Sequence, residues 1–439
     1  MIGFDVAAIE RHLAGRARII GTLAGKACAP APPGPDAIRS ALERPAWGGT
    51  ERCGSVFDAI RPGESVAIAV SDHTRKTAVD RVLPVLVEGW LACGCRLEDM
   101  FLIFASGIHR PPTAAEQKDI LGAAEAMFRG RLFFHEPDND RRLVRVGVTR
   151  RGHEVRINRR AAEADRLILT GAAAYHYHAG FGGGRKSLVP GLAARSTIAF
   201  THSLTLDPDA DRIRPGVEPG RLDGNPVAEE MLESARFREP DAIVNTVLTP
   251  DGRLAGVFAG GMDAAHRSAC ALVERVSRID IDEPADLVVA SAASSLNWIQ
   301  SHKALYNAHR AARGERGRIA LFAPCVEGLG DERFRHWVTR PDVREIYAGL
   351  RAQPEVLGQT ALSTRLRGRQ AVLATQMSGR DASDLGIPAE ARLEDAIDRC
   401  LEDLARLGVK RPTCYLMGDA LSLVPFLDTQ RRLRPVALH

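Results

Sequence analysis

The sequence predicts an α/β protein of two domains, each a mostly parallel or mixed sheet flanked by helices, with the functional site in the cleft between them. Two observations lead to this fold class. Short apolar runs of strand length alternate with amphipathic stretches of helical period through most of the chain. The chain has 439 residues, of which 45% are hydrophobic, and this length corresponds to two or three domains of ordinary size.

Three apolar runs in the first half of the chain are predicted to be strands, and each ends in a polar loop. They are Ser65–Val70, Phe101–Ala105 and Arg166–Thr170. A helix is expected over Val79–Leu91, and a second helix is expected to open at Pro112 and Thr113. Open α/β sheets bind their ligands at the carboxyl ends of strands. The three polar loops are therefore candidate site segments.

The segment Arg278–Pro284 separates two such alternating regions and is the expected domain boundary. We expect residues 1–278 to form an N-terminal domain and residues 279–439 a smaller C-terminal α/β domain, whose last helix can pack back on the first domain. The strands expected in the second region are Asp286–Ala290, Arg318–Phe322, Gln370–Thr375 and Thr413–Met417.

The composition argues against nucleic acid and membranes as partners. Lys and Arg together number 59 and Asp and Glu 55, so the net charge is only +4, too small for bulk attraction to a polyanion. Aromatic residues make up 5%, which is few for stacking on single-stranded nucleic acid. Asp5, Glu10 and Arg11 interrupt any signal-peptide core near Met1. Because the eight cysteines are scattered without a CxxC pair, we expect a reducing, cytoplasmic location.

A glycine-rich segment, Tyr175–Leu204, is the most informative part of the sequence. Its glycines are Gly180, Gly182, Gly183 and Gly184, and without Cβ atoms their N–H groups can approach an anion closely. Arg185, Lys186 and Ser187 add further donors. Arg185 stands where the P-loop pattern requires its second glycine, so an ordinary nucleoside triphosphatase is not expected. A mobile surface loop is the alternative interpretation of this composition.

Histidines and an uncommon lysine surround these glycines. His176, His178 and His202 lie within the same segment, and His is both the commonest metal ligand and the commonest general base. The chain has only six lysines among its 59 basic residues. Where arginine is the default cation, a lysine can be present for its primary amine, which directs attention to Lys186 and Lys303.

Two other predicted strand ends and one helix start carry polar clusters. Ser71–Lys76 contains Asp72, Thr74 and Arg75, and a guanidinium is suited to bidentate recognition of a carboxylate or phosphate. His109 follows the second strand. In the second domain, Gln300 and Lys303 lie at a strand-to-helix turn, where a surface lysine is the alternative interpretation.

Together these four motifs, in their order and spacing, resemble the nickel-pincer lactate racemase family, also described as 2-hydroxyacid racemases and epimerases. The resemblance covers most of the chain, and the GFGGGRKSLVPG run is its most specific part. It implies a cytoplasmic isomerase with a cofactor-binding N-terminal domain. The implied cofactor is a pyridinium-3-thioamide-5-thiocarboxylic acid mononucleotide that carries nickel.

The resemblance also implies roles for individual residues. Lys186 would carry the cofactor covalently and His202 would ligate nickel. Gly182, Gly183 and Gly184, with Asp72 and Thr74, would hold the cofactor and its phosphate. His109 and His176 would be the two acid/base groups, and Arg75, Gln300 and Lys303 would hold the substrate. His178 and His73 have no implied role, and proteins that synthesise the cofactor are the expected partners besides a small-molecule substrate.

The implied chemistry suits a 2-hydroxyacid, because hydride removal from C2 avoids a carbanion beside an ionised carboxylate. Two histidines near neutral pKa would exchange the hydroxyl proton, while the cofactor acts as the electron sink. Lactate enzymes of the family have a tyrosine where this chain has Ile299, and a tryptophan in a later helical region where Glu355–Gln359 has none. We therefore expect a substrate other than lactate.

Two alternatives from other classes remain at this point. A zinc-dependent hydrolase would use His176, His178 and His202, although no HExxH motif accompanies them. A non-catalytic anion- or nucleotide-binding protein would keep the fold and the glycine loop. The oligomeric state is left open.

Overall fold

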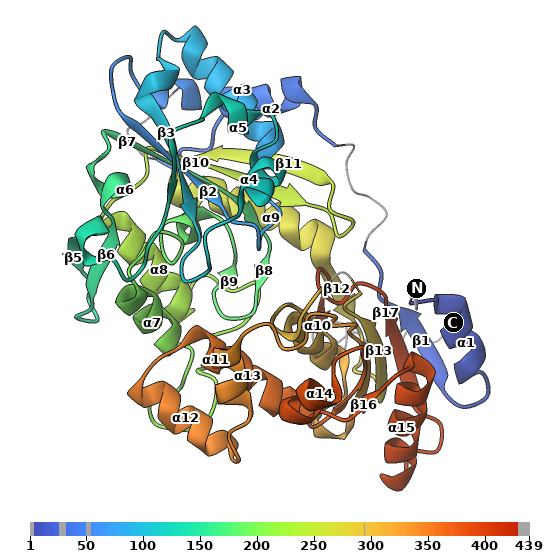
Figure 1. The fold of residues 1–439 in the computed structure, drawn as a ribbon. Coiled ribbons are helices and arrows are strands. Elements are labelled where there is room, and N and C mark those ends of the chain that lie inside the picture. The colour runs from blue at the N-terminus through green and yellow to red at the C-terminus, as the bar shows by residue number, and fades with distance from the viewer. Residues whose placement is uncertain (1–3, 26–31, 50–53, 294, 429–439) are drawn as a thin grey trace. The chain divides into compact units, whose positions relative to one another are not determined.

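The computed structural model describes residues 4–25, 32–49, 54–293 and 295–428. The chain divides into two compact units. One unit is formed by Cys28–Val276, and the other by Met1–Ala27 together with Ser277–His439. Each unit is built on its own six-stranded sheet (Figure 1).

The sheet of the first unit has the strand order β11-β10-β7-β2-β3-β4 and is parallel except for β11. Its strands are β2 (Val66–Ser71), β3 (Met100–Ala105), β4 (Leu132–Phe134), β7 (Arg166–Ala173), β10 (Ala242–Leu248) and β11 (Leu254–Gly260). The central strands β2, β7 and β10 are buried along nearly their whole length. Burial on both faces explains why they are continuous apolar runs rather than alternating ones.

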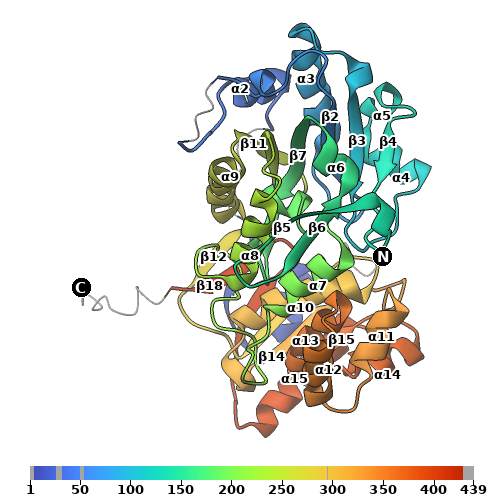
Figure 2. The ribbon, with the colours of Figure 1, turned by 90° about the vertical axis from the view of Figure 1, so that its left-hand side faces the viewer.

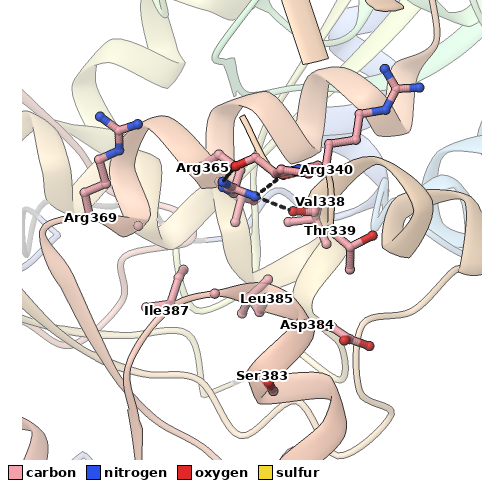
Figure 3. A pocket seen from close by; sticks show the side chains of 13 residues that line it. Val338, Thr339, Arg340, Arg365, Arg369, Ser383, Asp384, Leu385 and Ile387 are labelled. Atoms are coloured by element: carbon pink, nitrogen blue, oxygen red, sulfur yellow. Dashed lines mark hydrogen bonds between the residues drawn. The ribbon is translucent and has the colours of Figure 1, made fainter. Parts of the chain in front are cut away.

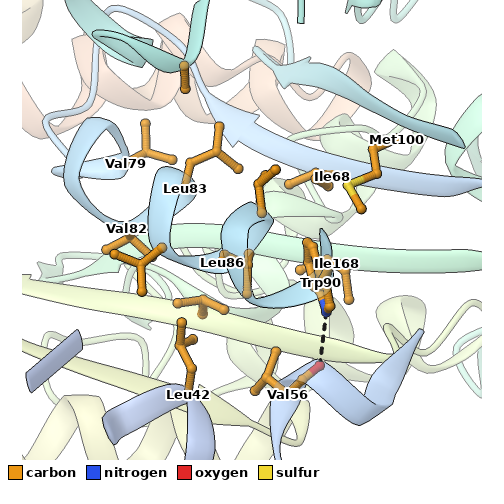
Figure 4. Close-up of a cluster of buried hydrophobic side chains, with 14 of the residues drawn as sticks. Leu42, Val56, Ile68, Val79, Val82, Leu83, Leu86, Trp90, Met100 and Ile168 are labelled. Atoms are coloured by element: carbon orange, nitrogen blue, oxygen red, sulfur yellow. Dashed lines mark hydrogen bonds between the residues drawn. The ribbon is translucent and has the colours of Figure 1, made fainter. Parts of the chain in front are cut away.

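Helices cover both faces of this sheet. They are α2 (Pro35–Glu43), α3 (Val79–Ala92), α4 (Ala114–Leu121), α5 (Ala124–Met127), α6 (Arg159–Glu163) and α9 (Met262–Ser277). The main core lies between α3 and the sheet, where Leu83, Leu86 and Trp90 pack on Ile68 and Met100 (Figure 4). A second cluster joins α9 to β7, β10 and β11. Residues from both sides of the sheet are therefore removed from water, which is the main stabilising contribution.

Further short elements follow β4 and β7. They are the β5–β6 hairpin (Leu143–Val148 and Glu154–Asn158), the β8–β9 hairpin (Tyr175–His176 and Gly180–Phe181), the 3₁₀ turn η4 (Gly184–Ser187), α7 (Arg195–Ser203) and α8 (Pro226–Arg236). Figure 2 shows β5, β6, α7 and α8 gathered away from α2 and α3. These elements build the candidate site.

The sheet of the second unit has the order β1-β17-β13-β14-β15-β16 and is parallel throughout. Its strands are β1 (Arg18–Thr22), β13 (Leu287–Ser291), β14 (Arg318–Phe322), β15 (Ala371–Ala374), β16 (Ala389–Glu390) and β17 (Thr413–Met417). A separate pair joins β12 (Arg278–Ile281) to β18 (Val424–Leu427).

The helices of the second unit are α1 (Val6–Leu13), α10 (Trp298–Ala311), α11 (Glu332–Val338), α12 (Val343–Ala352), α13 (Val356–Gly368), α14 (Gly379–Leu385) and α15 (Leu393–Arg406). α15 buries Leu393, Ile397 and Cys400 in one cluster with Ile9 and Leu13 of α1 and the neighbouring strands. The last helix of the described residues thus packs on its own sheet.

The predicted α/β class is confirmed, and each strand named from the sequence exists within one residue of its expected bounds, except that β7 continues three residues beyond Thr170, to Ala173. The division of the chain differs at its N-terminal end. The sequence analysis placed residues 1–278 together, whereas β1 pairs with β17 of the second sheet. Arg18–Thr22 had no partner that local sequence could identify, because β17 lies almost 400 residues away, at Thr413–Met417. Across the described ranges, no helix is long and apolar enough to cross a membrane.

Candidate active site

The loops that follow β2, β3 and β7 lie at one edge of the first unit's sheet. The three strands are parallel neighbours, so their carboxyl ends share that edge. Backbone hydrogen bonds also interlock the loops: Gly107 N donates to Gly191 O at 2.9 Å, and Gly191 N donates to Lys186 O at 3.0 Å. The structure therefore brings the motifs after three strands into one region, as the strand-end argument predicts.

Asp72 and His109 form a hydrogen-bonded pair in this region. Asp72 Oδ2 is 2.7 Å from His109 Nδ1, and Asp72 Oδ1 accepts hydrogen bonds from the backbone N and hydroxyl of Thr74 at 3.0 and 2.6 Å. Asp72 is only 2% exposed, whereas the His109 side chain is 48% exposed. Burial raises the pKa of the Asp72 carboxyl, but His109 and Thr74 outweigh it and leave this pKa below its ordinary value.

The Asp72 contact assigns the protonation of the neutral His109 ring. An ionised carboxylate can only accept a hydrogen bond, so His109 Nδ1 carries the proton and donates it to Asp72. The lone pair of the ring then lies on Nε2. This is the arrangement in which a carboxylate orients a histidine general base.

His176 ends β8 and meets a different set of neighbours. Its Nδ1 accepts hydrogen bonds from the backbone N–H groups of His178 at 3.2 Å and Ala179 at 3.1 Å. The ring of Tyr177 stacks on it with the centroids 4.9 Å apart. Burial, followed by the positive charges of Lys186 and Arg75, holds the pKa of His176 well below its ordinary value. The ring is therefore neutral at neutral pH.

His202 lies in the last turn of α7 and is buried. Its Nδ1 is 2.7 Å from the carbonyl oxygen of Ile198, four residues earlier on the same helix. A carbonyl can only accept, so the proton lies on Nδ1 and the lone pair on Nε2, which is the form that binds a metal. Burial and the charge of Lys186 lower the pKa of His202 to about 4, so the ring does not need to lose a proton to become a ligand.

Lys186 lies in η4, which the glycines shape. Gly183 has φ +76°, and a Cβ there would lie 2.7 Å from Asn245 Oδ1. Gly184 has φ +55°, and its Cβ would lie 2.8 Å from the His266 ring. Glycine is needed at both positions because of the positive φ and the close approach. Lys186 follows these two glycines, and its positive charge lowers the pKa of His176 and of His202.

Arg185 and Ser187 do not serve as the phosphate donors that the sequence analysis considered. Arg185 is 3% exposed, and its guanidinium is 3.2 Å from Ala228 O, 3.3 Å from Ala179 O and 3.3 Å from His266 Nδ1. Ser187 Oγ donates to Thr170 O at 2.7 Å. Both side chains are therefore held in the core by buried carbonyl groups.

Gln300 and Lys303 lie in the second unit, near the start of α10. Asn297 caps this helix by accepting from Gln300 N at 3.2 Å, and Gln300 Oε1 accepts from Leu296 N at 3.1 Å. That contact directs the amide NH₂ group of Gln300 away from the helix start. Gln300 and Lys303 are three residues apart and so share one helix face. They form one polar group after β13.

Residues 11–213 match the lactate racemase N-terminal domain family. A lactate racemase from Thermoanaerobacterium thermosaccharolyticum is 30% identical over 305 residues, which cover 69% of this chain and 68% of that protein. A lactate racemase from Lactiplantibacillus plantarum is 31% identical over 285 residues, covering 64% of each chain. The chain belongs to the lactate racemase family.

Solved structures support the same fold for this lactate racemase family member. The lactate racemase apoprotein from T. thermosaccharolyticum matches with a TM-score of 0.80 at 24% identity, over 93% of this chain and 95% of that one. A protein from Thermotoga maritima matches with a TM-score of 0.66 at 17% identity, over 90% and 99%. Membership supports isomerase activity of the racemase or epimerase type.

Sequence reasoning missed three buried residues beside the site of this family member. Asn245 on β10 accepts from Gly184 N at 2.7 Å, and its Nδ2 has no hydrogen-bond partner among the described residues. Ser106 Oγ, directly after β3, is likewise buried without a partner in the part of the chain that the structure describes. His266 of α9 approaches Gly182 O at 2.8 Å through Nε2. Asn245 and His266 lie far from the motif in sequence, and the only available signal was a polar residue inside an apolar strand or helix face.

The two histidines without an implied role are placed differently. His178 is buried with its ring 4.1 Å from that of Tyr177, and His73 is 4.0 Å from Glu116. Within the described ranges, no three His, Cys, Asp or Glu side chains are grouped so that they could hold a metal ion by themselves. The three histidines of the zinc-hydrolase alternative therefore do not form a zinc cluster.

A pocket of about 410 Å³ lies in the second unit among α11, α13 and α14 (Figure 3). Arg340, Arg365 and Arg369 line it together with Leu385 and Ile387. Arg365 is engaged with the carbonyl oxygens of Val338 and Arg340 at 2.8 and 2.7 Å. None of the candidate site residues lines this pocket.

Proposed function

We propose that the protein inverts the C2 stereocentre of a 2-hydroxyacid other than lactate, using a nickel-pincer nucleotide attached to Lys186 with nickel on His202. One observation carries the proposal. Lys186 lies close enough to His176 and His202 to lower the pKa of both, and His202 presents an Nε2 lone pair. The charge of a lysine beside the glycine turn thus acts on a metal-ready imidazole and on a second neutral imidazole.

The residues present fit the proposed cofactor. The Lys186 amine would form the covalent link, and His202 Nε2 would complete the nickel ligands. The backbone of Gly182–Gly184 and the partnerless donors Asn245 Nδ2 and Ser106 Oγ would meet polar groups of the nucleotide, since buried donors without a protein partner usually bind something else. When bound, this cofactor supplies an acceptor for hydride from C2.

The protein would hold the substrate through its carboxylate. Arg75 is exposed in the loop after β2, and its positive charge is one of the causes that lower the pKa of His176. Gln300 and Lys303, which belong to the second unit, would complete the carboxylate and hydroxyl contacts.

His109 would accept the hydroxyl proton through Nε2. Asp72 fixes the ring with Nδ1–H toward its carboxylate and stabilises the imidazolium that forms, so Asp72 is a positioning residue for this step. This differs from the sequence-based role of Asp72 in cofactor binding, because both of its oxygens are already engaged by Thr74 and His109.

Two positions support a substrate other than lactate. Ile299, which replaces the tyrosine of the lactate enzymes, lies in the first turn of α10 next to Gln300 and brings no phenol hydroxyl. Glu355–Gln359 begins α13, with Glu355 capping the helix at Gly358 N at 2.8 Å, and brings no indole. A substrate contact through a phenol hydroxyl at position 299, or through an indole within Glu355–Gln359, is therefore not available to this chain. The proposed enzyme acts on a small molecule in the cytoplasm and receives its cofactor from biosynthesis proteins.

The proposal is tested by the mass and metal content of protein made in cells that synthesise the cofactor. We expect a mass increment that maps to Lys186, nickel near one equivalent, and loss of optical purity of a 2-hydroxyacid. Lys186→Ala should lack the increment and the activity, while Lys118→Ala, at an exposed helical lysine, serves as the matched control. Full activity of Lys186→Ala, or an unmodified and nickel-free wild type under conditions that load a relative, would refute the proposal.

A further inference from the structure

Two exposed apolar side chains lie together at one edge of the second unit's sheet. Across the described ranges, Val326 and Leu296 are the two most exposed large hydrophobic side chains, at 60% and 50%. Leu296 follows β13 and Val326 follows β14, and these strands are parallel neighbours. Glu327 N donates to Leu296 O at 2.9 Å, so the backbones of the two loops are joined at these residues. Leu296 and Val326 therefore form an apolar pair at the carboxyl edge of the sheet, where open α/β sheets bind ligands.

The loop after β14 is shaped so that Val326 faces water. Cys325 has φ +47°, in the left-handed region that residues other than glycine seldom adopt. Its side chain is fully buried, with Sγ 3.2 Å from Ser301 Oγ of α10. Trp298 N donates to Gly328 O at 3.0 Å and ties the loop to the start of α10. An exposed valine contributes little to the stability of the unit. A strained and anchored loop that presents one therefore points to a binding role for Val326.

The apolar pair adjoins the polar group that would hold the substrate. Leu296 N donates to Gln300 Oε1 at 3.1 Å, and Lys303 lies about one helical turn further along α10. In a 2-hydroxyacid, the carboxylate, the hydroxyl and the side chain all branch from C2. When Gln300 and Lys303 hold the first two groups, the side chain can extend over the apolar pair.

A negative charge beside the apolar pair narrows the choice of side chain. Glu327 follows Val326 and is exposed, with Oε2 3.5 Å from Asn297 Nδ2. A second carboxylate on the substrate, as in malate, would be repelled by Glu327. The hydroxyls of a sugar acid would gain no hydrogen bond from two hydrocarbon side chains. An aliphatic chain, by contrast, loses water-exposed area on contact with them.

We propose that the apolar pair binds the side chain of the substrate, and that the substrate is a 2-hydroxyacid with an aliphatic side chain larger than the methyl group of lactate. This inference rests on the proposed function, whose substrate it narrows. Each methylene that leaves water is worth about fourfold in binding. The side chain of 2-hydroxyisocaproate has three more carbons than that of lactate. Because an open pair covers only one side of this chain, we expect a preference of roughly tenfold in kcat/KM rather than the full ~60-fold.

The preference is tested on cofactor-loaded, full-length protein with 2-hydroxyisocaproate, lactate and malate, each followed by chiral chromatography. Leu296→Asn and Val326→Thr keep nearly the same shape and remove the apolar character. In the double variant, the preference for 2-hydroxyisocaproate over lactate should fall by roughly tenfold, through KM and not kcat. Val148→Thr and Leu407→Asn, at side chains 42% and 38% exposed, are the matched controls and should keep the preference. A wild type that prefers malate or lactate, or a double variant that keeps the preference, would overturn the proposal.

Binding is observed separately by NMR of full-length protein with ¹³C-labelled Leu and Val methyl groups. Leu296→Asn and Val326→Thr assign the two signals by their loss. We expect both signals to shift with 2-hydroxyisocaproate and not with malate, while those of Val148 and Leu407 stay in place. Unchanged signals would overturn the proposal. So would shifts that follow protein concentration without ligand, which would assign the apolar pair to a contact between two copies of the chain.

The two proposals can fail independently. A cofactor-loaded wild type that racemises no 2-hydroxyacid would refute the proposed function, and the methyl spectra would still decide whether the apolar pair binds an aliphatic chain. A wild type that racemises malate fastest would support the proposed function and refute the role of Leu296 and Val326.

Discussion

Replacing Asp72 by Asn tests the hydrogen bond on which the proposed base depends. The amide is nearly isosteric, and its oxygen can still accept from Thr74, as Asp72 Oδ1 does at 3.0 and 2.6 Å. The amide nitrogen then faces His109 Nδ1, where the carboxylate oxygen lay at 2.7 Å. An N–H donor there favours a lone pair on Nδ1 and moves the ring proton to Nε2. His109 would then present no lone pair to the substrate.

The expected loss follows from removing the base. General-base catalysis contributes about 10²–10⁴-fold, which corresponds to about 3–5 kcal/mol of transition-state stabilisation. We expect kcat and kcat/KM to fall together by this factor, because the proton transfer occurs only in the transition state. The assay follows optical rotation or chiral chromatography of a 2-hydroxyacid that the wild type racemises, with the rate divided by the cofactor content measured by mass.

Asp99→Asn is the matched control, since Asp99 forms an ion pair with Arg96 at 2.8 Å before β3, at the opposite edge of the sheet. It should change neither rate nor cofactor content. A different result would refute the reasoning. If Asp72→Asn lost its cofactor while the rate per loaded site stayed at the wild-type value, Asp72 would serve the cofactor and not His109.

Three further changes probe the surroundings of Lys186. Gly183→Ala should lower the free energy of unfolding by at least ~1 kcal/mol and reduce the mass increment at Lys186, because φ is +76° and the new Cβ would lie 2.7 Å from Asn245 Oδ1. Urea unfolding measures the stability, and intact mass measures the increment. A variant as stable as the wild type would contradict this prediction. His202→Ala should keep the gain in mass at Lys186 but bind no nickel in metal analysis. If the variant retained its nickel, His202 would be excluded as a ligand. The pKa of His266 is lowered to about 3, first by burial and then by Arg185. Below pH ~6.5 the unfolded state therefore binds more protons than the folded state. The free energy of unfolding of the wild type should fall as the pH is lowered from ~6.5 toward 3, and it should fall less steeply in His266→Gln. If urea unfolding at a series of pH values gave the same slope for both proteins, the prediction would be wrong.

The sequence was sufficient for β2, β3 and β7 of the first unit's sheet and for the loops that follow them, whereas β4, β10 and β11 were not named from it. Ser65–Val70 and Arg166–Thr170 are continuous apolar runs because their strands are buried on both faces, and the polar residues just beyond them are where such sheets bind ligands. β1 was not assigned to the C-terminal sheet, since its pairing with β17 is a contact between the two ends of the chain. Local periodicity carries no information about such a partner.

The donors of the glycine turn were only partly predictable. Arg185 and Ser187 looked like anion donors beside Lys186, yet their side chains are 3% and 8% exposed and bond to core carbonyls. The direction of each side chain depends on the positive φ values of Gly183 and Gly184. Glycine permits those values but does not require them, so composition alone could not tell which donors face the site.

The neutral tautomer of each of the three histidines depends on the group that its Nδ1 contacts, which is the local backbone for His202 and His176 and the Asp72 carboxylate for His109. On α7, the Nδ1 of His202 meets the carbonyl four residues earlier, and helices always present carbonyl oxygens in that direction, so the proton stays on Nδ1. In the β8–β9 turn, the Nδ1 of His176 meets the N–H groups two and three residues later, so the proton moves to Nε2. His109 meets a carboxylate from another strand end and keeps its proton on Nδ1. The same side chain can thus present either a lone pair or an N–H on Nε2, and the group that contacts Nδ1 selects between these two forms before any ligand binds.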